Sequence, residues 1–147
     1  QDEVMLKKLK YCRDMHHTLA NFSLMLKSGN MQKHKGEKCF DRFDVFVADL
    51  ADYFMGLSDA ILDSSTKINK EILKNYLSRF ADVYDYMKRV YFIDNKELVN
   101  RIITQGREPI ESKDDVERYM DLAKCYWEMR VDYFKANCPE HSESLDS

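Results

Sequence analysis

The sequence predicts an all-α fold, an antiparallel bundle of four long helices with a short extra helix before the last. Three observations support this fold class. Apolar residues recur at alternating spacings of three and four in four segments, which is the period of a helix that buries one face. The 147 residues include only four glycines and two prolines, too few for the turns of a β-rich fold. The links between the segments are short, which favours antiparallel neighbours.

The first two helices are predicted over residues 3–28 and 39–62. The apolar row of the first is Met5, Leu9, Cys12, Met15, Leu19, Phe22 and Leu26. The second carries a heptad-like row, with a three-four alternation throughout: Phe40, Phe43, Val47, Leu50, Phe54, Leu57 and Ile61. Five aspartates fall outside that row, and we interpret them as the face that the second helix shows to water: Asp41, Asp44, Asp49, Asp52 and Asp59.

The third and fourth long helices are predicted over residues 66–92 and 113–137. The row of the third is Leu73, Tyr76, Phe80, Val83, Met87 and Val90. The row of the fourth is rougher and comprises Val116, Met120, Ala123, Trp127, Val131 and Phe134. At about 25 residues each, the four long helices would be about 37 Å long.

A short amphipathic helix is predicted over residues 94–105. Asp94 followed by Glu97 resembles a capping box for it, and Ser112 with Asp115 forms a weaker cap for the last helix. We expect one helical-bundle domain over residues 1–138. Residues 139–147 lack apolar periodicity and are predicted to form a flexible tail or linker.

Composition and motifs argue against several functions. The formal net charge of −3 is small, so nothing favours nucleic-acid binding. No apolar run approaches the roughly 20 residues of a membrane span. We find no metal-ligand motif such as HExxH or CxxC, no Gly-rich phosphate loop, and no cofactor signature. Cys12 and His16 are four residues apart, but they lack a third catalytic group, so no enzyme is predicted.

The four cysteines leave the redox compartment open. Cys39 and Cys138 are expected at opposite ends of the bundle, too far apart for a disulfide. Cys12 and Cys125 lie at similar heights on helices that could be neighbours, so one bridge is conceivable. The favoured interpretation is a reduced intracellular protein in which Cys12 is a small buried hydrophobic residue.

Aromatic residues on the last two long helices exceed what one narrow row needs. They either widen the core or form an interface with another protein or a second copy. The predicted interface residues are Tyr84, Tyr91, Tyr119, Tyr126 and Trp127.

Basic residues concentrate at one expected end of the bundle. They are either a solvated lysine-rich loop or a site for an anionic ligand such as an acidic lipid. The anionic-ligand candidates are Lys33, Lys35, Lys38, Lys88 and Arg89.

Three functions follow, in order of preference. The first is a non-enzymatic interaction module of adaptor or scaffold type, cytoplasmic and part of a larger protein. The second is a peripheral membrane or phosphoinositide-binding domain that uses the basic end. The third is a secreted four-helix ligand of cytokine type, which predicts a Cys12–Cys125 bridge and a glycan on Asn21.

Overall fold

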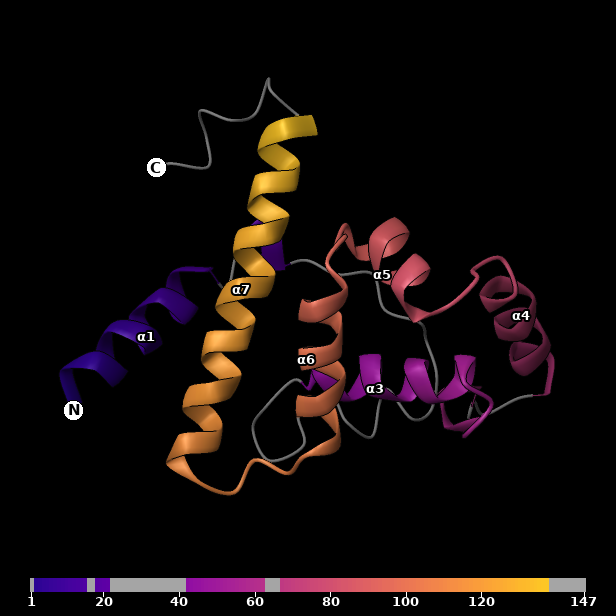
Figure 1. The fold of residues 1–147 in the computed structure, drawn as a ribbon, viewed down its shortest axis with the longest axis horizontal. Coiled ribbons are helices and arrows are strands. Elements are labelled where there is room, and N and C mark those ends of the chain that lie inside the picture. The colour runs from indigo at the N-terminus through magenta and orange to yellow at the C-terminus, as the bar shows by residue number, and fades with distance from the viewer. Residues whose placement is uncertain (1, 16–17, 22–41, 63–66, 138–147) are drawn as a thin grey trace. The chain divides into compact units, whose positions relative to one another are not determined.

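The computed structural model describes residues 2–15, 18–21, 42–62 and 67–137 (Figure 1). Every regular element within these ranges is a helix, and none of them contains a strand, which confirms the all-α class. The elements are α1 (Asp2–Met15), the 3-10 helix η1 (Leu19–Asn21), α3 (Phe43–Phe54), the 3-10 helix η2 (Ala60–Leu62), α4 (Lys67–Leu77), α5 (Val83–Tyr91), α6 (Lys96–Arg107) and α7 (Lys113–Asn137).

The predicted lengths are confirmed only in part. Helix α7 covers residues 113–137 as expected, and α6 corresponds to the short extra helix. The second long helix ends early, at Phe54, and the third is divided into α4 and α5. The first ends at Met15, and its expected continuation beyond residue 21 lies outside the described residues. Four long helices are therefore the wrong description, and their antiparallel arrangement is not confirmed.

Helix α3 ends early because Gly56 adopts a left-handed backbone, with φ of 69°. The Gly56 N–H donates to the Tyr53 carbonyl at 3.0 Å, and the Leu57 N–H donates to the Asp52 carbonyl at 2.8 Å. These two bonds form the Schellman arrangement that closes a helix end. Such a motif usually packs the residue after the glycine on an apolar neighbour, but Leu57 is 70% exposed. The glycine is a stop signal inside an apparently continuous apolar row.

The third predicted helix is divided because Asp82 starts a new helix. The Asp82 carboxylate accepts a hydrogen bond from the Asp85 N–H at 2.8 Å, and the Asp85 carboxylate accepts one from the Ala81 N–H at 3.1 Å. The two bonds resemble a capping box with aspartate in both places, except that Asp85 accepts from the residue before the cap. The Ala81 N–H, more than any other group, lowers the pKa of Asp85.

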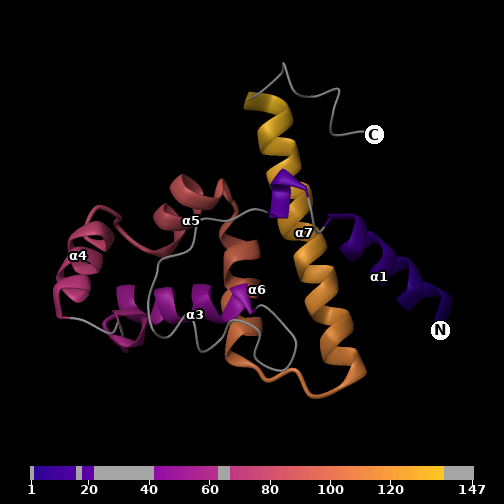
Figure 2. The ribbon, with the colours of Figure 1, turned by 180° about the vertical axis from the view of Figure 1, so that it is seen from behind.

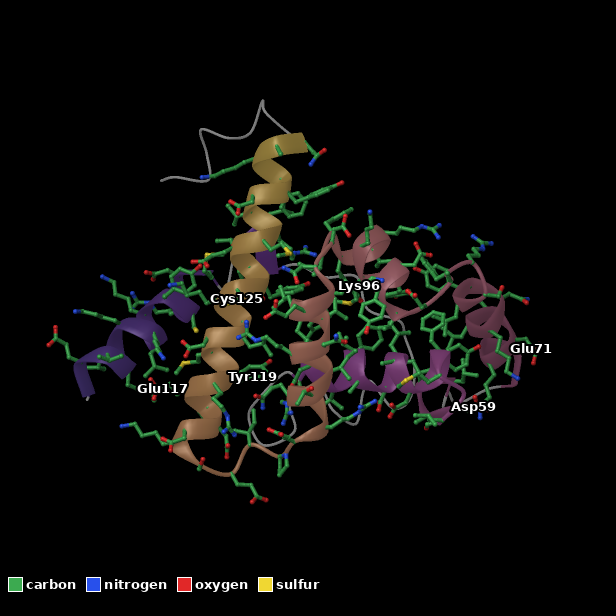
Figure 3. The ribbon with its side chains drawn as sticks, in the orientation of Figure 1. Asp59, Glu71, Lys96, Glu117, Tyr119 and Cys125 are labelled. Carbon is green, nitrogen blue, oxygen red and sulfur yellow. The ribbon has the colours of Figure 1, made fainter. Side chains whose placement is uncertain are left out.

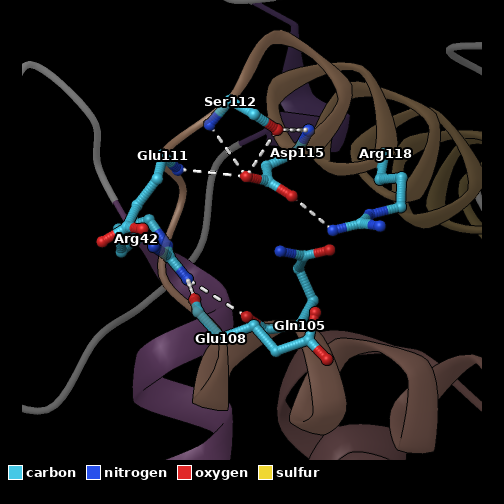
Figure 4. Close-up of polar contacts among 7 residues, drawn as sticks. All are labelled: Arg42, Gln105, Glu108, Glu111, Ser112, Asp115 and Arg118. Atoms are coloured by element: carbon cyan, nitrogen blue, oxygen red, sulfur yellow. Dashed lines mark hydrogen bonds and ion pairs between the residues drawn. The ribbon is translucent and has the colours of Figure 1, made fainter.

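The caps of α6 and α7 differ in how well the sequence predicted them. The α6 cap is Asn95, whose side chain accepts from the Leu98 N–H at 2.9 Å, so the prediction of Asp94 was wrong by one residue. The α7 cap is confirmed: the Ser112 hydroxyl accepts from the Asp115 N–H, and the Asp115 carboxylate accepts from the Ser112 N–H at 2.8 Å (Figure 4). Asn side chains cap helices as well as Asp, so spacing alone does not choose between adjacent residues.

The chain groups into two compact units, each built from segments that are distant in the sequence. Unit 1 takes its described residues from Gln1–Ser23, Tyr91–Ile93 and Ile110–Ser147, and so contains α1, η1 and α7. Unit 2 takes them from Leu24–Val90 and Asp94–Pro109, and contains α3, η2, α4, α6 and nearly all of α5. Residues 138–147, which include the predicted tail, lie outside the described residues.

Unit 2 is organised by a close approach of α3 and α6. A Cβ atom added at Gly106 of α6 would lie 2.1 Å from the Asp44 carbonyl oxygen and 3.0 Å from the Ala48 Cβ. Only a residue without a side chain allows the two backbones to come this near. Ala48, at 4% exposure, completes the small-residue contact.

Arg42 links the same two helices at one edge of this contact. Its guanidinium donates two hydrogen bonds to the Asp44 carboxylate, both at 2.8 Å. It donates two more to the carbonyls of Gln105 and Glu108, both at 3.1 Å (Figure 4). Asp44 is only 2% exposed, so its interpretation as a solvent-facing residue was wrong. A buried carboxylate is tolerated here because a bidentate arginine compensates its charge.

Candidate interaction surface

Helix α1 packs on α7 along a polar and aromatic row, so its orientation within unit 1 is defined. The Lys8 ammonium donates to the carboxylates of Glu117 at 2.8 Å and Asp121 at 2.9 Å. The hydrogen bond to Asp121, followed by the one to Glu117, raises the pKa of Lys8. The Tyr11 ring lies 6.2 Å from that of Trp127. Both ribbon views show α1 beside α7 (Figures 1 and 2), and Figure 3 labels Glu117 on the latter.

The other side of α1 carries leucines that nothing within the described residues covers. Leu6 is 64% exposed and Leu9 is 48% exposed. Leu6, Leu9 and Arg13 are spaced three and four apart and share one stripe of the helix. We call these three residues the outer row. Val4 is also exposed, at 53%, but its spacing places it on a different side of α1.

The predicted apolar row of the first helix is therefore only partly buried. Met5, Cys12 and Met15 are half-buried, as expected of a helix with one neighbour. Leu9 and Leu19, which the same row contains, are exposed, Leu19 at 54%. The prediction assumed a helix enclosed in a bundle, and in unit 1 only α7 flanks α1 among the described helices.

A buried arginine fastens three separate segments of unit 1 to one another. Arg130 of α7 is 3% exposed and donates to the carbonyls of Ala20 and Tyr91, both at 2.8 Å. Its guanidinium lies 5.4 Å from the ring centres of Tyr126 and Phe134. Aromatic faces attract a cation, and the two carbonyls accept hydrogen bonds from two of its nitrogens.

Phe92 is held in an unusual backbone conformation beside this arginine. Its φ of 62° is rare for a residue with a bulky side chain. The ring stacks on Tyr133 at 4.6 Å with an interplanar angle of 10°. These contacts stabilise the conformation, which costs roughly 1–2 kcal/mol in an isolated chain.

The sequence missed the buried row of α7. That row consists of Met120, Leu122, Tyr126 and Arg130, whereas the residues predicted with Met120 are all half-buried. An arginine among aromatics at a spacing of four was the available signal, but a charged residue is rarely read as part of a core. The predicted apolar row of α7 therefore lies beside the row that is buried.

The five predicted interface aromatics have different surroundings. Tyr91 and Tyr126 are buried, at 0% and 6% exposure, and belong to the core of unit 1. Trp127 is half-buried and its indole N–H donates to the Asn21 side chain at 3.0 Å. Tyr119 is half-buried on α7 (Figure 3).

Tyr84, the fifth of these aromatics, belongs to unit 2. Its hydroxyl donates to the Asn100 side chain at 2.6 Å, and the Lys96 ammonium lies 5.2 Å from its ring centre. Its polar end and one ring face are thus already occupied within unit 2.

The described members of the predicted anionic site are both engaged with carboxylates. Lys88 pairs with Asp94 at 2.8 Å, and this hydrogen bond raises the pKa of Lys88. Arg89 pairs with Asp85 at 3.1 Å and lies 4.6 Å from the Phe80 ring centre. Lys33, Lys35 and Lys38 lie outside the described residues.

The two described cysteines are free thiols, so the conceivable Cys12–Cys125 bridge is absent. Both are half-buried, and Figure 3 labels Cys125 on α7. Burial raises the pKa of Cys12, which lowers the fraction of reactive thiolate. Cys39 and Cys138 lie outside the described residues.

The remaining observations do not point to a known class of site. No described helix is long and apolar enough to cross a membrane. No group of three or more His, Cys, Asp or Glu side chains suited to a metal ion occurs in the part of the chain that the structure describes. Comparisons with protein-family models, curated proteins and solved structures found no match to this chain. Function is therefore inferred from the residues themselves.

Proposed function

We propose that this chain is a non-enzymatic helical module for protein–protein interaction, and that the outer row of α1 is its contact surface. The observation that carries the proposal is the exposure of Leu6 and Leu9, one turn apart on one side of a helix. Single exposed apolar residues are common on protein surfaces. Two exposed leucines on one side of a helix give another helix an apolar surface to pack against.

The packing of α1 on α7 supports this function. The Lys8 bonds to Glu117 and Asp121 hold one side of α1 against α7. The outer row consequently belongs to a helix that already packs on α7 in the free chain, through these ion pairs and the Tyr11–Trp127 ring contact. A preorganised surface loses less conformational entropy on binding than a mobile one does.

The proposed contact differs in composition from the aromatic surface expected from the sequence. Tyr91 and Tyr126 are buried in the core, and the Trp127 indole is hydrogen-bonded to the Asn21 side chain. The leucines of α1 have no such internal role among the described contacts. Lys88 and Arg89 already pair with carboxylates of the chain, so they support an anionic-ligand function less than the leucines support a protein contact.

A photo-crosslinking side chain placed at residue 6 tests the proposal, with the same group at residue 4 as the matched control. Leu6 and Val4 are similarly exposed on the same helix but lie on different sides of it. In cells that express the chain, we expect protein adducts from position 6 and few from position 4. Equal yields at both positions, or no protein adduct from position 6, would contradict the assignment of the contact surface.

A further inference from the structure

We propose that the partner of the outer row is the α1 helix of a second copy of this chain, bound antiparallel across a two-fold axis. This inference rests on the proposed function and specifies its partner. It is carried by the symmetry of the α1 residues themselves. A two-fold interface requires a surface that is complementary to itself, and the outer row meets this requirement.

The apolar part of the row is self-complementary. With the axis placed between residues 7 and 8, Leu6 of one copy meets Leu9 of the other, and the contact occurs twice. In heptad terms Leu6 and Leu9 occupy an a and a d position, and a packs against d in an antiparallel pair. The exposure of these side chains, 64% and 48%, leaves apolar surface to bury.

The charges along α1 favour the same arrangement. Glu3 and Lys10 both flank the row on its solvent side, at equivalent heptad positions, so the antiparallel pairing brings Glu3 of one copy near Lys10 of the other. Glu3 is 82% exposed, and its pair with Lys7 at 3.1 Å is a surface contact of little strength that it can exchange. The row itself ends in Arg13, whose guanidinium pairs with the neighbouring Asp14 at 3.0 Å.

The proposed contact leaves the fold of unit 1 intact. Lys8 and Tyr11, which face α7, are not part of the outer row. A second copy can therefore bind without breaking the α1–α7 contact. Val4 also lies away from the contact, which makes it a natural control.

The size of the contact predicts a weak dimer. Helix α1 has 14 residues and is about 21 Å long. One such helix pair buries less than the roughly 1,200–2,000 Å² of a standard stable interface. We therefore expect a dimer whose population depends strongly on concentration, with a Kd in the micromolar range or above.

Sedimentation equilibrium on the full chain tests the inference between about 1 μM and about 1 mM protein. We expect the weight-average mass to rise from monomer toward dimer. Leu6→Glu should weaken the dimer at least about tenfold, because it places a carboxylate against Leu9 of the partner. Val4→Glu should leave the Kd unchanged. Circular dichroism of each variant verifies that the helices are retained.

A charge exchange provides the test of orientation. Glu3→Lys alone and Lys10→Glu alone should each weaken the dimer, because each places like charges together. The double variant Glu3→Lys/Lys10→Glu should restore the Kd of the original chain. A double variant as weak as the two single variants would overturn the antiparallel arrangement.

The outcomes separate this inference from the function on which it rests. A monomer at every concentration, or a dimer equally sensitive to Val4→Glu and Leu6→Glu, overturns self-association through the outer row. If position 6 then still cross-links to a different protein, the proposed function stands with another partner. If neither self-association nor a cross-link is found, both are overturned.

Discussion

Among individual residues, Arg130 has the largest consequences because it is charged, buried and shared by distant segments. It donates to Ala20 in η1 and to Tyr91 at the end of α5 while lying among aromatic rings. Both carbonyls belong to the ends of helical elements, where backbone acceptors have no partner within the helix. One side chain thus satisfies acceptors that two short elements leave open.

We expect Arg130→Lys to destabilise the chain by about 2 kcal/mol, because one ammonium group cannot reproduce a planar fork directed at two carbonyls. Arg130→Ala should cost about 3 kcal/mol, since both buried acceptors lose their donor. Urea denaturation measures the free energy of unfolding. The control is Lys124→Ala on the same helix, an exposed position, which should change stability by less than about 0.5 kcal/mol. Equal losses for Arg130→Ala and Lys124→Ala would contradict the anchoring role.

At the scale of helices, the α3–α6 contact depends on Gly106. We expect Gly106→Ala to destabilise the chain by about 3 kcal/mol, because its Cβ would lie 2.1 Å from the Asp44 carbonyl oxygen. The gain of about 1 kcal/mol in helix propensity does not offset such a clash. Thermal and urea unfolding measure the loss.

Gly56 offers a contrasting substitution. An added Cβ there meets nothing within 4 Å, so only the left-handed backbone opposes it. Gly56→Ala should therefore cost about 1–2 kcal/mol, less than Gly106→Ala. The reverse order would mean that the two helices can separate to admit a methyl group.

The α7 cap should make stability depend on pH. The hydrogen bond from the Ser112 hydroxyl, followed by those from the backbone N–H groups of Glu111 and Ser112, lowers the pKa of Asp115 in the folded chain. A lowered folded pKa means that the stabilisation is complete above about pH 4 and is lost as the pH falls through the folded value.

Asp115→Asn should consequently lower the Tm at neutral pH, and the difference from the original chain should shrink below about pH 4. Asp114→Asn removes an exposed charge from the same turn and serves as the control. Melting curves measured by circular dichroism across this range give the comparison. A Tm difference that stays constant with pH would show that the carboxylate charge has no part in the cap.

How far the helices could be predicted depended on local signals. Helix α7 has the predicted bounds although its apolar row is rough, and its cap follows from the spacing of Ser112 and Asp115. The break at Gly56 was missed because the apolar spacing continues through it, from Phe54 to Leu57 and Ile61. The break before α5 had a signal in Asp82 and Asp85, but aspartate at both places is weaker evidence than a Ser/Thr and Glu pair.

The candidate surface was predicted less well than the helices. Period alone placed Leu9 in the core, but burial also depends on what covers a helix, which is a tertiary property. Tyr91 and Tyr126 show the opposite error. They were predicted to lie at an interface because aromatic residues were in surplus, but both are buried within the chain. The buried Arg130 could not be assigned from pattern, because the carbonyls that accept its hydrogen bonds are distant in the sequence. The partner of Asp44 is only two residues away, but the burial of Asp44 depends on the packing of α6 on α3, which the pattern of α3 does not contain.

On the scale of the whole molecule, each of the two units contains buried residues of its own. Unit 1 is centred on residues such as Met120, Tyr126 and Arg130, whereas unit 2 is centred on residues such as Leu50 and Met87. Cooperative units of this kind can open with different free energies. Destabilising one core should therefore not weaken both equally.

We expect Gly106→Ala to reduce amide hydrogen-exchange protection in α3 and α6 more than in α7. Arg130→Lys should have the opposite pattern, with the larger loss in unit 1. Exchange followed by mass spectrometry of peptides from each unit measures both. A uniform loss of protection in either variant would show that the units unfold as one.

The chain contains a single tryptophan, Trp127, and the structure places it in unit 1 with its indole bonded to Asn21 and Tyr11 nearby. Its emission spectrum is therefore an optical reporter of one half of the molecule. Unfolding of unit 1 should shift that emission to the red as water reaches the indole, while helical ellipticity records both units. An emission transition at a different urea concentration from the ellipticity transition would resolve the two halves without any label.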